Sequence, residues 1–140
     1  MKTLFSVWLF LVLVCAGFSA GAEIKEVYDV SIIQLIATPK KYAHKAVRVV
    51  GFLNIGFEGD AIFLHEEDFR CGLLSNGLGI RAEPEIRRRL EKLTGQYVII
   101  EGVVDARYAD AVSVGPFRIL ITSITRADAW KVGPAPTPPP

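Results

Sequence analysis

The run from His65 to Asp68, His-Glu-Glu-Asp, places four side chains that could do chemistry next to one another. An imidazole beside carboxylates can act as a general acid or base, and the same groups are common metal ligands. Neighbouring residues of a strand point to opposite faces, so His65 could act with Glu67, with His44 as a more distant partner. The sequence has no HExxH or CxxC spacing, and we predict no metal and no cofactor. The run is also typical of a charged strand end that prevents edge pairing.

Arg87-Arg88-Arg89 is the only run of three basic residues. Two of its members have an acidic residue four positions away, which is typical of a solvent-exposed helix face stabilised by ion pairs. Arg88 and Lys92 have no such partner and could contact an anion or a nucleic acid.

A third set of residues could bind a ligand rather than transform it. Phe63 offers a surface on which a base or a sugar can stack, and arginine and histidine side chains can pair with an anion. The alternative is that the N-terminal segment covers Phe63 while the arginines extend beside it. The candidate ligand-binding residues are Arg48, Phe52, Phe63, His65 and Arg81. Whether they meet depends on the strands that carry them.

Alternating or nearly continuous apolar residues indicate the strands. Both faces of residues 45–56 are partly apolar, and Gly51 and Gly56 would allow a bulge or a sharp bend. Glu58-Gly59-Asp60 and Asn76-Gly77 are turn signals. The run YVIIEGVV predicts a central strand that is covered on both faces. The predicted strands are residues 45–56, 61–65, 78–81, 97–104 and 117–125.

Two short helices are predicted, one before the first strand and one between the third and the fourth. Ser31 and Gln34 have the spacing of a capping box, and Pro39 limits the first helix to about two turns. Pro84 suits the first turn of the second helix, residues 83–94, and Gly95 suits its C-terminal cap.

This element order, α-β-β-β-α-β-β, favours a mainly β protein built as a five-stranded OB-fold-like barrel. We assign residues 23–44 to an N-terminal segment with a short helix and residues 45–130 to the barrel, with Trp130 packed as a lid. Residues 131–140, which include GPAPTPPP, favour a flexible, polyproline-like tail. Ligands of OB-folds commonly lie on the face of the second and third strands, where the candidate residues would gather.

Residues 1–22 are typical of a signal peptide. Lys2 precedes the apolar run 4–18, and small residues up to Ala22 fit a cleavage site. The run is shorter than the roughly 20 apolar residues of a membrane-spanning helix, so we expect no membrane span after cleavage. Two alternatives are a retained anchor and lipidation at Cys15, although Val14 stands where lipidation sites usually carry a small residue.

Removing this leader takes one lysine and no acidic residue from the 16 basic and 15 acidic residues, so the remaining charges balance. A balanced chain has no bulk attraction to nucleic acid or to an anionic membrane. Cys71 is the only cysteine outside the leader. It cannot form an intrachain disulfide, so it is either free or joins two chains.

The longest distinctive stretch is VRVVGFLNIGFEGDAIFLHEEDF, in which the run GFL-x-x-x-FEG-x-A-x-x-LH-x-ED is the most unusual part. Four further stretches are VSIIQLIATPKKY, SNGLGI, YVIIEGVVDA and ITSITRADAW. Together they span about residues 30–130 and resemble a family of small exported bacterial OB-fold-like proteins. The resemblance implies the fold and export, and it implies no activity. The loop after the fourth strand, rich in glycine and histidine in that family, is RYADAVSVGP here, so a site built on loop histidines does not carry over.

These observations predict a non-catalytic binding module of the bacterial envelope, periplasmic or secreted. It would hold a peptide, an envelope protein or an oligomeric ligand on the face of its second and third strands. One alternative is an extracytoplasmic OB-type nucleic-acid binder, which needs a basic concave face. The other is a small hydrolase, which needs His65 and Glu67 to converge in a cleft.

Overall fold

The computed structural model describes residues 26–57, 59–110 and 116–131. The predicted signal peptide lies outside these residues, as does the predicted tail apart from Lys131. No helix within them is long and apolar enough to cross a membrane. The elements in chain order are β1 (Val27–Asp29), α1 (Ile32–Ala37), α2 (Pro39–Tyr42), β2 (Ala46–Asn54), β3 (Ala61–Phe63), α3 (Glu66–Arg70), the 3-10 turn η1 (Leu74–Asn76), β4 (Gly77–Ile80), α4 (Pro84–Glu91), β5 (Tyr97–Asp105) and β6 (Leu120–Ala129).

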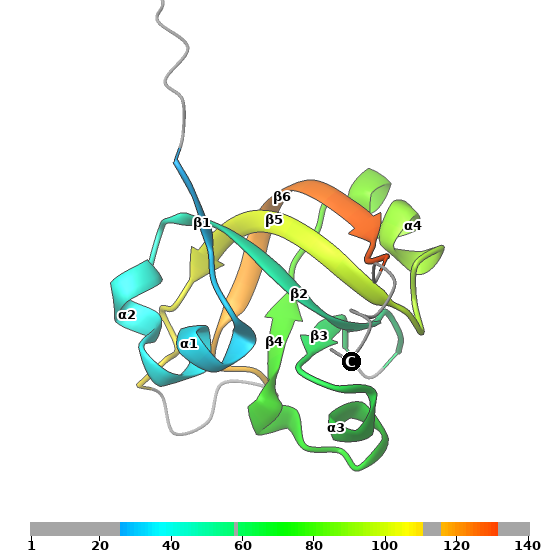
Figure 1. Ribbon diagram of the computed structural model, residues 1–140, viewed down its shortest axis with the longest axis horizontal. Coiled ribbons are helices and arrows are strands. Elements are labelled where there is room, and N and C mark those ends of the chain that lie inside the picture. The colour runs from blue at the N-terminus through cyan, green and yellow to red at the C-terminus, as the bar shows by residue number, and fades with distance from the viewer. Residues whose placement is uncertain (1–25, 58, 111–115, 132–140) are drawn as a thin grey trace, which may run out of the picture.

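Five of the strands close into a barrel (Figure 1). Antiparallel pairs join β2 to β3, β3 to β4, β5 to β6 and β2 to β5, while β4 and β6 run parallel. The pairing of β2 with β5 closes the sheet on itself, and β1 lies parallel to the start of β2 outside the barrel. With α4 between β4 and β5, this is the predicted OB-fold-like barrel.

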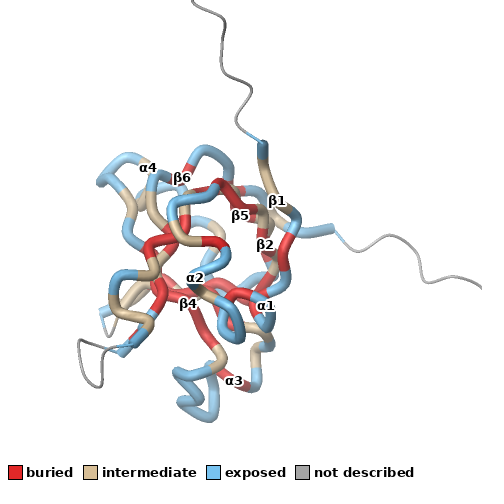
Figure 2. Tube along the Cα trace, turned by 90° about the vertical axis from the view of Figure 1, so that its left-hand side faces the viewer, coloured by how far each residue is buried: buried red, intermediate tan, exposed pale blue. Residues whose placement is uncertain are grey.

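The barrel interior is filled by alternate residues of its strands. Val47, Val49 and Leu53 of β2 are at most 1% exposed, and Val98 and Ile100 of β5 are fully buried. Figure 2 shows the buried residues along the barrel strands and the exposed ones mainly on helices and connections. Burial of each of these aliphatic side chains contributes about 1.5–3 kcal/mol to folding.

The N-terminal segment packs on the barrel through α1. The predicted capping box is present, because the Gln34 N–H donates to Ser31 Oγ at 3.2 Å and the Ser31 N–H donates to Gln34 Oε1 at 3.0 Å. Ile32 and Leu35 on the inner face of α1 are fully buried. α1 ends at Ala37, within the two turns that Pro39 was predicted to allow, and Pro39 begins the separate helix α2, since proline is compatible with the first helical position.

The helix α4 buries Leu90 against the barrel and is shorter than predicted, ending at Glu91. Pro84 occupies its first turn, as the sequence predicts. The chain leaves the helix region through Gly95, whose φ of 78° favours glycine and whose N–H donates to the Leu53 carbonyl at 2.8 Å. This bond ties the connection after α4 to β2.

We predicted that the acidic run ends a strand, and this is wrong. The run forms the first turn of a helix. β3 stops at Phe63 and α3 begins at Glu66. Asp68, 8% exposed, accepts the His65 main-chain N–H at 3.0 Å and the Asn76 Nδ2 at 2.8 Å. Acidic side chains at a helix N-terminus are favourable because unpaired N–H groups point toward them. The run therefore closes the connection between β3 and β4.

The last strand begins and ends later than predicted. β6 covers Leu120–Ala129 rather than residues 117–125, because Phe117 packs on the outside of the barrel instead of pairing. The Trp130 main-chain N–H continues the β5 pairing by donating to the Tyr97 carbonyl at 2.8 Å. Its side chain is 44% exposed and does not form the predicted lid.

Gly51 is needed for a close approach rather than for a bulge. The β2–β5 register runs without a break from Ala46 to Phe52. A Cβ at Gly51 would lie 2.5 Å from the Phe63 carbonyl oxygen and 2.7 Å from Ile32 Cδ1. The missing side chain therefore lets both β3 and α1 reach β2.

We expect Gly51→Ala to lower the free energy of unfolding by about 1–3 kcal/mol, because the added methyl group overpacks this junction. Chemical denaturation followed by circular dichroism measures the change. Gly56→Ala is the matched control, since the nearest atom to its added Cβ is 3.6 Å away. Equal losses in the two variants would show that the junction tolerates a methyl group.

Candidate functional site

The aromatic residues predicted to bind a ligand are buried on the outside of the barrel. Phe52 and Phe63 are paired across β2 and β3 and are 5% and 2% exposed. The Phe69 ring of α3 lies 5.9 Å from the Phe52 ring and 5.6 Å from the Phe63 ring. Phe117 also packs against Phe63, with 6.0 Å between ring centroids. The cover comes from α3 and the segment before β6, not from the N-terminal segment.

Two glycines make room for this cover. Gly77 and Gly79 alternate along β4 with the inward-facing Leu78, so they lie on its outer face. A Cβ at Gly77 would lie 2.9 Å from Phe63 Cδ1, and one at Gly79 would lie 3.1 Å from Phe117 Cβ. The spacing Gly-x-Gly in a strand was the sequence signal that another segment approaches this face closely. The outer face of β3 and β4 is thus a second small core.

Arg48 lies on the outer face of β2 in an ion-pair network. Its Nε donates to Glu101 Oε1 at 2.8 Å and its Nη1 to Asp29 Oδ1 at 3.1 Å. Arg126 Nη1 also approaches Glu101 Oε1, at 3.3 Å. The hydrogen bond from Arg48 is the main cause that holds the pKa of Glu101 below its ordinary value. Arg48 is therefore neutralised locally by two carboxylates.

Arg81 follows the end of β4, away from Phe63, and His65 is the residue before α3. Gly77 pairs with Phe63, so Arg81, four residues further along the chain, lies roughly 13 Å away along β4 at about 3.3 Å per residue. Its guanidinium is 4.0 Å from the carboxylate of Asp105, whose pKa is lowered mainly by a hydrogen bond from Arg107. Of the five predicted binding residues, the structure joins only Phe52 and Phe63 in one cluster.

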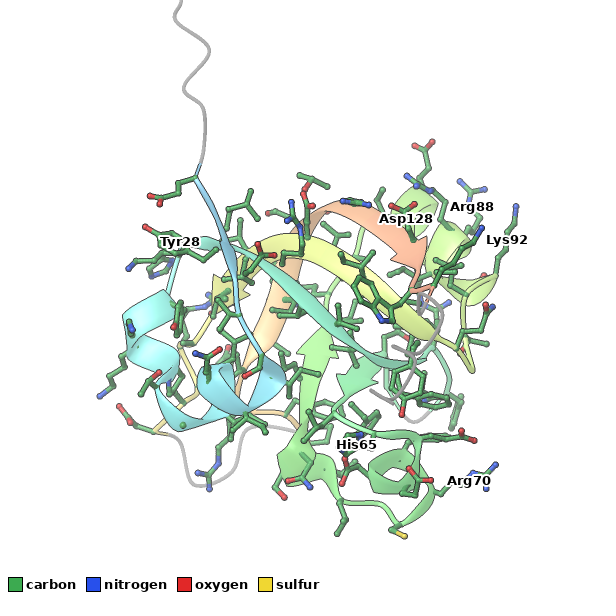
Figure 3. All side chains as sticks on the ribbon, in the orientation of Figure 1. Tyr28, His65, Arg70, Arg88, Lys92 and Asp128 are labelled. Carbon is green, nitrogen blue, oxygen red and sulfur yellow. The ribbon has the colours of Figure 1, made fainter. Side chains whose placement is uncertain are left out.

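The groups predicted for acid–base or anion chemistry are also separate. Figure 3 shows His65 beside α3 and Arg88 and Lys92 on the far side of the molecule, extending from α4. Within the described ranges, no hydrogen bond links His65 to Glu67, and no group of three or more His, Cys, Asp or Glu side chains could hold a metal ion. Cys71 is exposed and free.

Arg87 of the basic run has a structural role. Its guanidinium donates to both oxygens of Asp60, from Nε at 2.8 Å and from Nη2 at 3.1 Å. It also pairs with Glu91 one turn further along α4, as the sequence predicts. Arg87 therefore joins α4 to the connection between β2 and β3.

An open groove lies on the outer face of the barrel where β2 and β5 pair. Val50 and Ile99, which are register partners, form its apolar floor, and Trp130 forms one wall. Its volume is about 460 Å³. We call it the β2/β5 groove, and its lining residues are Asp29, Val30, Ser31, Arg48, Val50, Ile99 and Trp130.

Tyr97 extends the exposed apolar surface beside the groove. It is paired with Trp130 at the start of β5, and it is 37% exposed. Its ring meets Phe52 edge-on, with 5.7 Å between centroids, and its hydroxyl oxygen accepts the Glu66 N–H at 3.3 Å. Tyr97 and Ile99 were missed because the continuous apolar run of β5 predicted cover on both faces, and Trp130 was predicted to be a packed lid rather than part of a binding surface. The charged Glu101 inside that run was the signal that one face is open.

No family model and no curated protein matches the chain. One solved structure that it resembles is an engineered binder, described as OBody AM3L15 bound to hen egg-white lysozyme. The two are 14% identical with a TM-score of 0.44, over 70% of this chain and 86% of that chain. The assignment of the fold therefore rests on the strand order and register given above.

The Glu101 network predicts a pH dependence of stability. The pKa of Glu101 is lowered in the folded protein, so its contribution is complete above the ordinary value of 4.5 and is lost as the pH falls through the lower folded pKa. We expect the stability difference between wild type and Glu101→Gln to be largest above that pH and to shrink in acid. Denaturation at several pH values measures it. Glu85→Gln, on the exposed side of α4, is the control, and a difference for Glu101→Gln that grows in acid would contradict the assignment.

Phe69 should stabilise the outer aromatic cluster although it is partly exposed. An aromatic pair contributes about 0.5–1.5 kcal/mol, and Phe69 makes two such contacts, so Phe69→Ala should lower the free energy of unfolding by about 1–3 kcal/mol. Leu73→Ala, at a similarly exposed apolar position nearby, should change it less. Thermal and chemical denaturation of both variants measure these changes. Equal losses in the two variants would contradict the stabilising role of Phe69.

Proposed function

We propose that the protein is an exported, non-catalytic binding module of the bacterial envelope that holds an extended segment of a protein or peptide in the β2/β5 groove. The observation that carries this proposal is the open apolar floor of Val50 and Ile99 beside the exposed ring of Trp130. The protein class is the one predicted from sequence. The contact surface moves from the face of β3 and β4, which the chain fills with its own rings, to that of β2 and β5.

The composition of the groove favours a protein segment. Peptide-binding grooves combine apolar contact with a few polar groups that fix orientation. Here Val50 and Ile99 supply the apolar contact, and Arg48 is held in place by Asp29 and Glu101. A rim that is already ordered loses little conformational entropy when a ligand binds.

The charge balance of the groove counts against the nucleic-acid alternative. A binder of the phosphate backbone needs an excess of positive charge along its surface. Arg48 is the only cation among the groove residues, and it lies between two carboxylates, one of them Asp29 in the same lining. The contacts of His65 among the described residues do not favour the hydrolase alternative. Its main-chain N–H donates to the Asp68 carboxylate in the first turn of α3.

The proposal is tested by affinity capture from an envelope extract with wild-type protein, Trp130→Ala and Phe57→Ala. Trp130→Ala removes the wall of the groove, and we expect it to lose the captured partner. Phe57→Ala deletes a fully exposed aromatic side chain that does not line the groove, and it should capture the partner as wild type does. Identical capture by wild type and Trp130→Ala would contradict the proposed site.

A further inference from the structure

The exposed aromatic pair beside the groove is suited to a particular backbone conformation. Tyr97 and Trp130 are 37% and 44% exposed, and a main-chain hydrogen bond of 2.8 Å pairs them at the start of β5. Grooves lined by aromatic side chains are the common receptors of polyproline II segments. Such segments have no internal hydrogen bonds, so their carbonyl groups are free to accept from a receptor.

Suitable donors are present at this site. The Tyr97 hydroxyl accepts from Glu66 and keeps its own proton to donate. Among the described residues, none accepts a hydrogen bond from the indole N–H of Trp130. A proline-rich segment over these rings would therefore meet both an apolar surface and hydrogen-bond donors.

The chain carries such a segment immediately after the site. Residues 134–140 read Pro-Ala-Pro-Thr-Pro-Pro-Pro, so five of the eight prolines of the chain lie there. They begin four residues after Trp130, following Gly133, which can turn the chain back. Seven residues in the polyproline II conformation extend about 22 Å. The path from β6 across β5 to β2 is two strand spacings, about 10 Å, so the segment is long enough.

We infer that the β2/β5 groove with Tyr97 is a binding site for polyproline II segments and that residues 134–140 of the same chain occupy it. This inference rests on the proposed function, whose groove it uses, and it names the class of ligand. A proline-rich partner would compete with the chain's own segment, so the segment sets a threshold for binding.

The intrinsic fluorescence of Trp130 tests the inference directly. The chain has two tryptophans, and Trp8→Phe leaves Trp130 as the only one, whether or not residues 1–22 are removed. In this background, wild type is compared with a full-length variant in which Pro134, Pro136, Pro138, Pro139 and Pro140 are replaced by alanine. Acrylamide quenching and the emission maximum are measured for both.

We expect Trp130 to be less accessible to acrylamide, with emission at shorter wavelength, when the five prolines are present. A synthetic peptide of residues 132–140 should shift the emission of the alanine variant toward that of wild type, and Tyr97→Ala should weaken this titration. Equal quenching of both proteins and no response to the peptide would overturn the inference. Protection that disappears on dilution would also overturn it, because the segment would then come from a second copy.

Partner capture separates a failure of this inference from a failure of the proposed function. If the alanine variant captures more partner than wild type, the chain's own segment competes for the groove. If the fluorescence test fails while Trp130→Ala still abolishes capture, the groove binds a partner and residues 134–140 do not occupy it. If Trp130→Ala leaves capture unchanged but Trp130 is protected by the prolines, the segment docks there and the partner binds elsewhere.

Discussion

The absence of a side chain at Gly51 is the constraint on which the rest of the barrel depends. β2 is the one strand that contacts β1, β3 and β5 together, and its register with β5 is unbroken. β5 pairs with one edge of β2, and β1 and β3 pair with opposite ends of the other edge. The space between β1 and β3 on that edge lies close to β2. Ile32 of α1 and the backbone of β3 both occupy the space that a side chain at Gly51 would take. The closed barrel and the attachment of α1 therefore follow from one contact.

The outer face of β3 and β4 shows how a surface that commonly binds ligands can become part of the core. Phe52 and Phe63 lie where an OB-fold often presents aromatic rings, but Phe69 and Phe117 pack over them. The glycines of β4 allow this cover to lie close to the strand. In return, the cluster holds α3 and the segment before β6 against the barrel. The open part of the outer face is then the neighbouring β2/β5 groove.

The ion pairs of this molecule mainly hold its own segments together. Arg48 and Arg87 each bond a carboxylate from another part of the chain, and Arg107 bonds Asp105, two residues before it. In the groove, Arg48 is paired with Asp29 and Glu101, so apolar contact becomes the main interaction that a partner could use there. This balance connects the even charge of the sequence with the proposed preference for a protein segment.

The sequence by itself determined the elements whose causes are local. The Ser31–Gln34 capping box, Pro84 at the start of α4 and Gly95 after it act within one or two turns, so residue types and spacing were sufficient to predict them. The order of these elements was sufficient for the barrel, because few folds place one helix between the third and fourth of five strands. The helix α3 was missed because five residues are too few to show a periodicity.

Only the tertiary structure decided which faces of the strands are open. Alternation shows that Phe63 and Ile99 point away from the barrel interior, and it cannot show what lies over them. Phe63 is covered because Phe69 and Phe117 reach it from other segments, while Ile99 stays partly open because no described segment crosses it. Burial depends on contacts between residues far apart in the chain, and a single sequence carries no local signal for those contacts except the glycines that make room for them.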